Sequence, residues 1–367
     1  MLLTSDNKRI LLFQIYPVWR GPSLDMRVPL GMLYLGNSLI KAGYEVEVFH
    51  IEEGQIDSEI SKIDFNDILF IGVCSVLTGF SLRSAISFSK KVRSKYNIIP
   101  VVWGGVQASS IPEICLKEEF VDAVGIGEGE ELIVDIAKVF NGLRNPNKVK
   151  GLAFKDVDGS IIVNERRDFI KDFDEYHADY SLIDLNRYII NGNITGLIMS
   201  SRGCPFNCTF CYNNAFNKGR WRKHSAEYVI NELRRLHSQY KFTAFSFSDD
   251  NFFVDKDRAI TLIKESCNLG LRVYSVDIKI NHITDSDIKA FGQYEVGSIF
   301  FGTESLNPRL IKLINKKQTK ERVIEENCTA RSKTLGAELK KSACIDCDSR
   351  LVDVTAKLVL KLASFIA

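Results

Sequence analysis

Three cysteines in one short loop carry the strongest chemical signal in the sequence. Cys204, Cys208 and Cys211 are spaced C-x3-C-x2-C, directly after the apolar run of residues 196–200. Three thiolates held this close together can bind three irons of a cubane 4Fe–4S cluster, whereas a compact cluster of this type normally has four cysteine ligands. One iron would then stay open to a substrate or cofactor, as one position does in a catalytic zinc site.

Two alternative interpretations of the loop are a zinc site and three unrelated thiols. Zinc would need a fourth ligand near the loop. The next cysteine in the sequence is Cys267, and only His224 lies closer to the loop along the chain. The spacing favours the cluster over both alternatives. Gly203 and Pro205 can bend the chain around the first ligand, and Phe210 makes the second gap apolar.

The loop resembles the signature of the radical S-adenosylmethionine (SAM) enzymes, C-x3-C-x-aromatic-C, in which an aromatic residue stands where Phe210 does. The resemblance implies that SAM binds the open iron through its amino and carboxylate groups, with Phe210 in the SAM pocket. It also implies that the reduced cluster cleaves SAM to a 5′-deoxyadenosyl radical.

Length and composition restrict the class of protein. A chain of 367 residues predicts two domains, and 45% hydrophobic with 26% charged residues is typical of a globular protein. The net charge of +2 argues against a nucleic-acid partner. No apolar run approaches the roughly 20 residues of a membrane span, and no signal peptide is recognisable. Nine cysteines, an odd number, are expected to be reduced thiols in the cytoplasm.

Strands alternate with helices in the first part of the chain. The residue patterns predict strands at residues 9–16, 45–50, 67–73, 99–103 and 122–126, and helices at residues 29–41, 81–96 and 131–140. The unbroken apolar run at residues 67–73 is typical of a strand that is buried on both faces. The alternation predicts an α/β fold with a doubly wound parallel sheet, similar to a Rossmann fold.

Ligands of such sheets bind outside the carboxyl ends of the strands. Small and polar residues gather at these positions, and the candidates are Ser75, Gly104, Gly105, Gly127 and Glu128. The alternative is that each glycine forms only a tight turn. No G-x-G-x-x-G follows the first strand, which argues against a nicotinamide site.

The first part of the chain resembles the cobalamin-binding domain that precedes the catalytic barrel in one branch of the radical SAM enzymes. The matching landmarks are residues 29–31, 39–46, 104–105 and 121–130. The resemblance implies that the crevice takes the nucleotide tail of the corrinoid. The D-x-H-x-x-G motif is absent, because residues 17–28 contain no histidine, so no axial histidine from that loop is expected. His50 is expected to be a surface or packing residue.

The remaining chain predicts a connection and a second domain. Residues 150–154 and 160–164 form a predicted β-hairpin, and the polar residues 172–184 a solvated linker. The predicted domains are 1–142 (cobalamin-binding type), 143–192 (hairpin and linker) and 193–367 (barrel). In the barrel, strands are predicted at 194–200, 244–247, 272–276 and 298–301. A helix is predicted at 225–240, with Ser225 as N-cap and Val229, Leu233 and Leu236 buried.

Acidic residues follow two barrel strands. Asp249 and Asp250 come after the second strand and Glu304 after the fourth, where polar residues of a parallel barrel face the active site. The alternative is that they cap helices. The resemblance implies that these acids lie close to SAM. Lys279 stands where relatives often carry arginine. The lysine keeps the positive charge but cannot form the two parallel hydrogen bonds of a guanidinium group.

The end of the chain predicts an incomplete radical SAM barrel. A helix at residues 319–335, a fifth strand at 338–345 and a last helix at 352–366 leave no sixth βα unit. Cys344 and Cys347 form a C-x2-C pair there, which is either a metal or thiol site or incidental; the incidental interpretation is favoured.

The combined prediction is a cobalamin-dependent radical SAM enzyme with three cofactors: a 4Fe–4S cluster, SAM and cobalamin. The resemblance favours methyl transfer to a carbon atom, with cyclisation and rearrangement as further outcomes. It also implies a reductant such as a flavodoxin or ferredoxin. The alternative hypothesis is a non-catalytic cobalamin or iron–sulfur binding protein with an incomplete barrel.

Overall fold

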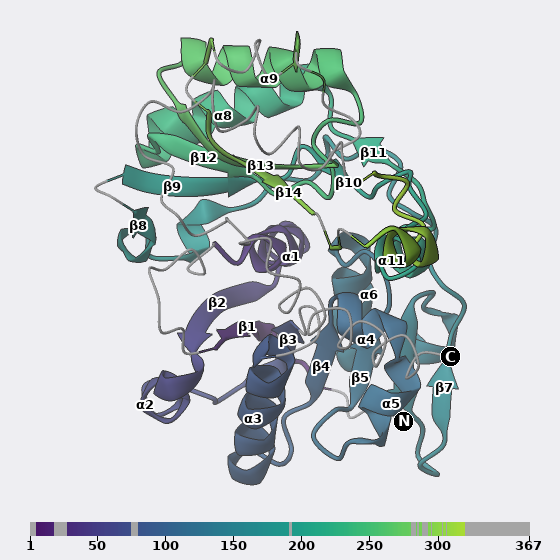
Figure 1. The fold of residues 1–367 in the computed structure, drawn as a ribbon. Helices are drawn as coiled ribbons and strands as arrows, with labels where there is room; N and C mark the ends of the chain where they lie inside the picture. The colour runs from purple at the N-terminus through teal and green to yellow at the C-terminus, as the bar shows by residue number, and fades with distance from the viewer. Residues whose placement is uncertain are drawn as a thin grey trace. The chain divides into compact units, whose positions relative to one another are not determined.

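The computed structural model describes residues 5–17, 28–74, 80–190, 193–279, 284, 286–287, 293–294, 296–302, 304–305 and 307–319. The chain divides into two compact units, Met1–Tyr188 and Ile189–Ala367, and Figure 1 shows their helices and strands. No helix in these ranges is long and apolar enough to cross a membrane. Ser75, Cys344, Cys347 and the helices and strand expected after residue 319 lie outside the described residues.

The first unit is built on a parallel sheet. Its strands are β1 (Arg9–Tyr16), β2 (Glu45–Glu52), β3 (Ile68–Cys74), β4 (Val101–Gly104) and β5 (Ala123–Gly125). These five strands are parallel and lie in the order β2-β1-β3-β4-β5. The order reverses between β1 and β3, the kind of switch point at which doubly wound sheets bind ligands. The doubly wound sheet is therefore confirmed.

Helices cover both faces of this sheet. They are α1 (Leu30–Lys41), α3 (Phe80–Lys95) and α6 (Glu130–Phe140), with the short α2 (Ile56–Ile60), α4 (Val106–Ser110) and α5 (Pro112–Lys117), which the sequence did not predict. Successive residues of a strand point to opposite faces. Leu11 and Phe13 of β1 accordingly share a core with Phe88 of α3, whereas Ile10 and Leu12 share the other core with the residues of α1 and α6.

The hairpin continues the first sheet. The strands β6 (Leu152–Lys155) and β7 (Ile161–Val163) pair antiparallel, which confirms the predicted hairpin, and β6 also pairs antiparallel with β5. The hairpin was predicted as part of a connection. Its pairing with β5 instead makes it the end of the seven-stranded sheet.

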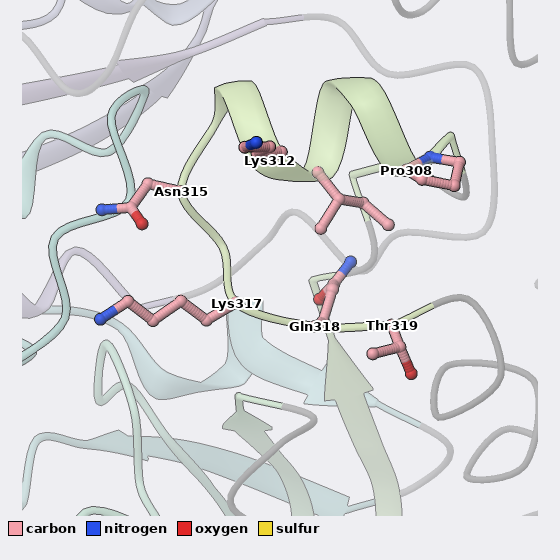
Figure 2. Close-up of a pocket in the computed structure, with 7 residues that line it drawn as sticks. Pro308, Lys312, Asn315, Lys317, Gln318 and Thr319 are labelled. Carbon is pink, nitrogen blue, oxygen red and sulfur yellow. The ribbon is translucent and has the colours of Figure 1, made fainter.

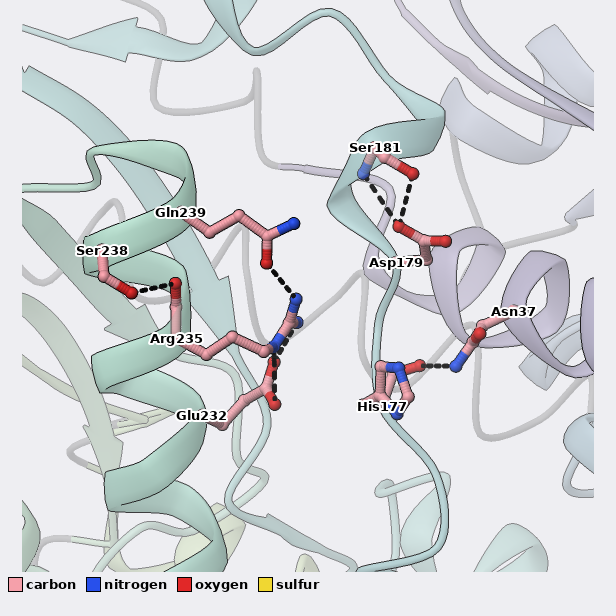
Figure 3. Close-up of polar contacts among 8 residues, drawn as sticks. All are labelled: Asn37, His177, Asp179, Ser181, Glu232, Arg235, Ser238 and Gln239. Carbon is pink, nitrogen blue, oxygen red and sulfur yellow. Dashed lines mark hydrogen bonds and ion pairs between the residues drawn. The ribbon is translucent and has the colours of Figure 1, made fainter.

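The segment that follows the hairpin packs on the first unit and is not a solvated linker. Ile170, Phe173 and Tyr180 are buried, because apolar residues alternate there with the acidic ones. Asn37 of α1 donates a hydrogen bond from Nδ2 to the His177 carbonyl over 3.0 Å (Figure 3). The acidic residues serve local turns: Asp179 Oδ1 accepts a hydrogen bond from the Ser181 backbone N–H over 3.0 Å.

The second unit contains a second parallel sheet. Its strands are β8 (Ile189–Ile190), β9 (Asn193–Ile198), β12 (Ala244–Phe247), β13 (Arg272–Ile278) and β14 (Val296–Phe301), in the order β14-β13-β12-β9-β8. Four of them are parallel, and β8 is antiparallel to β9. These four strands are the first four predicted barrel strands.

Two helices follow the first two barrel strands: α8 (Ala226–Tyr240) and α9 (Lys256–Asn268). Ser225 caps α8 as predicted, since its hydroxyl accepts a hydrogen bond from the Tyr228 N–H over 3.0 Å. The predicted stripe of Val229, Leu233 and Leu236 is buried. On the solvent side, Arg235 pairs with Glu232 and donates to Gln239 over 3.2 Å (Figure 3).

Candidate functional site

The cysteine loop leaves the carboxyl end of β9 and enters a short two-stranded ribbon. In this ribbon β10 (Ser201–Arg202) pairs antiparallel with β11 (Arg222–Lys223). Gly203 has φ +85°, and a Cβ atom there would lie 2.0 Å from the Arg220 carbonyl oxygen. Only glycine can therefore occupy this position, directly before the first cysteine, without movement of the backbone.

The three cysteines lie at the turn between this ribbon and the helix α7 (Asn213–Phe216). Cys208 is buried, and Cys204 and Cys211 are half-buried. The carbonyl oxygen of Cys208 accepts hydrogen bonds from the Cys211 N–H over 3.1 Å and from the Asn214 Nδ2 over 2.7 Å. Burial raises the pKa of the Cys204 and Cys211 thiols. Such thiols need neighbouring cations, hydrogen-bond donors or a metal to become thiolates.

The acidic pair after β12 fastens this loop. Asp249 is buried and accepts hydrogen bonds from the Ser200 N–H over 2.7 Å and from the Ser200 hydroxyl over 2.6 Å. Asp250 accepts one from the Gly203 N–H over 2.8 Å and another from the Tyr212 hydroxyl. The two carboxylates thus hold the residues on both sides of the cysteines at the edge of the sheet.

Neither acid of the pair caps α9, which was the alternative. Asp255 occupies the N-cap position and accepts a hydrogen bond from the Arg258 N–H over 3.1 Å. The buried guanidinium of Arg258 donates to the Ser200 carbonyl over 2.8 Å and to the His224 carbonyl over 2.9 Å. Arg258 was not singled out in the sequence, because its partners, Ser200 and the His224 carbonyl, lie in distant segments of the chain.

Asn251 adds an amide next to the first cysteine. Its Oδ1 accepts the Phe253 N–H over 3.3 Å, and its buried Nδ2 has no hydrogen-bond partner among the described residues. The side chain lies beside Cys204, where it lowers the pKa of the thiol against the larger raising effect of burial. A buried N–H donor near a cysteine suits a thiolate better than a neutral thiol.

A segment that follows β14 in the chain covers the middle of the loop. After α11 (Pro308–Leu313), the Ile314 carbonyl accepts a hydrogen bond from the Thr209 N–H over 3.0 Å, and Asn315 Nδ2 donates to the Asn207 carbonyl over 3.2 Å. The same segment forms a pocket of about 410 Å³ (Figure 2). The pocket is lined by Pro308, Ile311, Lys312, Asn315, Lys317, Gln318 and Thr319.

Two lysines lie over the aromatic rings of the loop. Lys279 Nζ is 3.6 Å from the centroid of the Phe206 ring, and Lys316 Nζ is 5.5 Å from that of Phe210. Lys316 is buried and donates to Glu304 Oε1 over 2.9 Å. Burial lowers the pKa of Lys279, and the nearby cysteines raise it. The structure therefore brings Glu304 and Phe210 together through Lys316.

Family models match both units. Residues 198–330 match the model of the radical SAM superfamily, and residues 27–137 match that of the B12 binding domain. An uncharacterized methyltransferase of Pyrococcus horikoshii is 31% identical over 308 residues, which are 83% of this chain and 66% of the relative. An anaerobic magnesium-protoporphyrin IX monomethyl ester cyclase of Synechocystis is 28% identical over 314 residues, which are 80% of this chain and 61% of the relative.

The chain belongs to the radical SAM enzymes that carry a B12-binding domain. Its fold is shared with two solved members. The methyltransferase TsrM from Kitasatospora setae, with cobalamin and a 4Fe–4S cluster bound, has a TM-score of 0.66 and 14% identity, with 90% of this chain and 65% of that chain covered. The cobalamin-dependent enzyme OxsB has a TM-score of 0.68 and 18% identity, with 89% and 48% covered. The chain thus spans less than two thirds of the length of these proteins.

The cysteine loop of this radical SAM chain fits a cluster by the chemistry of its donors. Cys204, Cys208 and Cys211 lie on one loop, and the amide of Asn213 donates a hydrogen bond to the Cys211 sulfur over 3.7 Å. A cubane cluster takes one thiolate per iron, so its ligands need not converge on one point. In the part of the chain that the structure describes, no group of three or more histidine, cysteine or acidic side chains is placed to hold a metal ion.

The predicted cobalamin residues lie at the carboxyl ends of β4 and β5. Gly104 ends β4, and no atom lies within 4 Å of a Cβ placed there. Gly105 has φ +98° and Gly127 φ +95°, so these two glycines are required by the backbone itself. The Gly127 N–H donates to the Ser109 hydroxyl over 3.0 Å. Glu128 is buried and accepts a hydrogen bond from the Ile170 N–H over 2.8 Å.

His50 is a packing residue, as expected. It is buried, its Nδ1 lies 2.8 Å from the Tyr188 hydroxyl, and its ring centroid lies 4.5 Å from that of Tyr16. Burial, and secondarily the charge of Arg187, lower its pKa to about 4. The imidazole is therefore neutral at physiological pH and is held between two tyrosines.

Proposed function

We propose that this chain is a cobalamin-dependent radical SAM enzyme that transfers a methyl group to a carbon atom of its substrate. The observation that carries the proposal is the cysteine loop, which Asp249, Asp250 and the segment after α11 hold at the carboxyl edge of a parallel sheet. Active sites of parallel βα barrels lie at this edge. The relatives named as methyltransferases support methyl transfer, and the relative named as a cyclase makes cyclisation the second candidate.

The residues of the second unit would hold the cluster and SAM. Cys204, Cys208 and Cys211 would ligate three irons and leave the fourth to SAM. Phe210, with 46% of its surface exposed, offers a flat apolar face. Glu304 offers an exposed carboxylate to polar groups of SAM. When bound, these cofactors would supply a 5′-deoxyadenosyl radical for hydrogen abstraction, and cobalamin would supply the methyl group.

Asp249 and Asp250 would act on the cofactors indirectly. Their oxygens accept hydrogen bonds from Ser200, Gly203 and Tyr212, so they would orient the loop. Lys279 and Lys316 would balance the negative charge that three thiolates and a cluster bring together. Burial raises the pKa of the Cys204 and Cys211 thiols, and neighbouring hydrogen-bond donors lower it again only in part.

The first unit would hold the corrinoid at the carboxyl ends of its parallel strands. Gly104 leaves open space there, and Gly105 and Gly127 bring bare backbone to the same edge. Ser75 belongs to the same proposal. The functional division that we propose is residues 1–142 for cobalamin and 193–367 for the radical chemistry, with residues 143–192, whose hairpin ends the first sheet, as the segment between them.

The reaction would need a one-electron donor of low potential, such as a flavodoxin or ferredoxin. We place the protein in the cytoplasm, because three ligand cysteines must stay reduced to bind a cluster. Both statements follow from the chemistry of the cluster.

A cofactor assay with a turnover step tests the proposal. Anaerobically purified full-length protein should contain iron, sulfide and corrinoid, and with SAM and a strong reductant it should form 5′-deoxyadenosine. Transfer of a labelled methyl group from cobalamin to substrate would separate methylation from cyclisation. Bound cofactors without any cleavage of SAM would instead support a non-catalytic cobalamin or iron–sulfur protein.

A further inference from the structure

A chain of side-chain hydrogen bonds ends on the third cysteine. Arg222 donates from Nη2 to Asn217 Oδ1 over 2.9 Å, and Asn217 donates from Nδ2 to Asn213 Oδ1 over 2.6 Å. Asn213 in turn donates from Nδ2 to the Cys211 sulfur over 3.7 Å. Asn213 and Asn217 are each 3% exposed, so water does not compete for these contacts.

The direction of this relay is fixed by chemistry. A guanidinium group can only donate hydrogen bonds, so the Asn217 oxygen must face Arg222. The Asn217 amide nitrogen then faces Asn213 and can only donate, so the Asn213 oxygen must accept. The remaining group of Asn213 is its NH2, which therefore points at the Cys211 sulfur. An isolated asparagine could turn its oxygen toward the sulfur, and this one cannot.

The relay is anchored where the ribbon and the loop meet. Arg222 belongs to β11 and pairs in register with Arg202 of β10, while Asn213 and Asn217 lie one helical turn apart at the start and just past the end of α7.

We infer that Asn213, oriented by Asn217 and Arg222, is a positioning residue that donates a hydrogen bond to the Cys211 thiolate and makes the bound cluster easier to reduce. This inference rests on the proposed function. A donor to a ligand sulfur stabilises the more negative form of a cluster more than the less negative form.

The reduction itself is a simple electron transfer. One electron passes from a low-potential donor of the flavodoxin or ferredoxin class, or from a chemical reductant in the assay, to the cluster. With three thiolates the net charge of the cluster changes from 1− to 2−. No proton moves, because an amide does not titrate. The hydrogen bond from Asn213 strengthens as the sulfur becomes more negative.

The test is a reductive titration of the reconstituted full-length protein with titanium(III) citrate, followed by electron paramagnetic resonance and without SAM. In Asn213→Leu the ratio of reduced to oxidised cluster at a fixed potential should fall about tenfold, the effect of one lost hydrogen bond. For one electron this equals a shift of about 59 mV to more negative potential. Asn217→Leu should shift the potential in the same direction by less, because it removes only the orientation of Asn213.

Two further variants separate tuning from folding. Asn214→Leu is the matched control: Asn214 is the next residue, but its Nδ2 donates to the Cys208 carbonyl and not to a sulfur. It should change iron content more than potential. Asn213→Asp keeps the shape of the side chain and replaces the donor with a negative charge, so its potential should fall further than that of Asn213→Leu.

The outcomes distinguish this inference from the proposed function. Wild-type protein that assembles no cluster would overturn both. Wild-type protein with a normal cluster, and Asn213→Leu and Asn213→Asp with unchanged potentials, would overturn the tuning role and leave the proposed function standing. If Asn213→Leu loses its iron, an unchanged potential in Asn213→Asp and Asn217→Leu would still overturn the inference.

Discussion

Replacing Gly203 with alanine tests how closely the cysteine loop must approach the ribbon. Gly203 has φ +85°, and its Cβ would meet the Arg220 carbonyl oxygen at 2.0 Å and the Asn217 Cβ at 3.2 Å. The first of these neighbours is backbone, so it cannot turn aside as a side-chain end could. Either the backbone at Arg220 moves away from the loop or Gly203 leaves its conformation, and the Gly203 N–H then loses its hydrogen bond to Asp250.

The free-energy cost of Gly203→Ala can be separated into two parts. A non-glycine residue with a left-handed backbone costs about 1–2 kcal/mol. The overlap with the carbonyl is an overpacking contact, which typically costs a further 1–3 kcal/mol. Gly219 supplies the matched control, because it lies in the same loop with φ +66° and nothing within 4 Å of its Cβ. Gly219→Ala should carry the first cost alone.

The assay is anaerobic reconstitution at limiting iron, with iron per chain and the rate of iron loss to a chelator as the readouts. The extra 1–3 kcal/mol in Gly203→Ala corresponds to roughly a 5- to 150-fold smaller population of the cluster-binding loop. Gly203→Ala should therefore retain much less iron than Gly219→Ala. Equal iron retention in the two variants would refute the argument from close approach.

Three further predictions concern the acidic pair, the cobalamin edge and His50. Asp250→Asn should lower the iron content per chain, because it weakens the hydrogen bonds from Gly203 and Tyr212 at a cost of about 1.5–3 kcal/mol. Tyr212→Phe should lower the iron content less, and a larger effect of Tyr212→Phe would contradict this prediction. Gly104→Leu should weaken cobalamin binding in a spectroscopic titration while the circular dichroism stays unchanged, since the Cβ position is open; unchanged affinity would move the corrinoid elsewhere. His50 has a pKa of about 4 in the folded chain, below the 6.5 of the free group, so the unfolded chain binds a proton first as the pH falls. The contribution of neutral His50 to the free energy of unfolding is therefore complete above pH 6.5 and falls by roughly 3 kcal/mol as the pH falls to 4. The stability difference between wild type and His50→Gln, measured by urea unfolding, should shrink over this window, and a constant difference would disprove the coupling.

The sequence predicted the strands well because their patterns are local. Residues 9–16 and 244–247 were predicted with the bounds of β1 and β12, since short, mainly apolar segments flanked by polar residues leave little freedom in where a buried strand ends. The short helices α4 and α5 were missed because a helix of five or six residues has too few turns to show a periodic pattern.

Long-range pairing explains the other differences. The hairpin was recognised from its turn, but its addition to β5 depends on a strand far earlier in the chain. The segment 172–184 reads as polar, and its buried residues, among them Phe173 and Tyr180, gain their partners only in the folded first unit.

In the candidate site, too, local features could be predicted from the sequence and long-range contacts could not. The cysteine spacing is local and could be recognised, and the acids after β12 could be placed at the edge of the sheet. Their partners could not, because Gly203 and Tyr212 reach Asp250 from another βα unit. Asn213 and Asn217 carried a weak signal, a spacing of four residues shortly after the third cysteine of the loop, which places them on one face of a helix.

The most direct test of the account is an electron paramagnetic resonance spectrum of the reduced full-length protein, recorded before and after SAM is added. If Cys204, Cys208 and Cys211 hold a cluster with an open iron, the wild-type spectrum should change when SAM binds. The variant with all three cysteines replaced by alanine should show neither cluster nor change. The assignment would be contradicted by a wild-type spectrum that does not change when SAM is added, or by a triple variant that keeps a normal cluster.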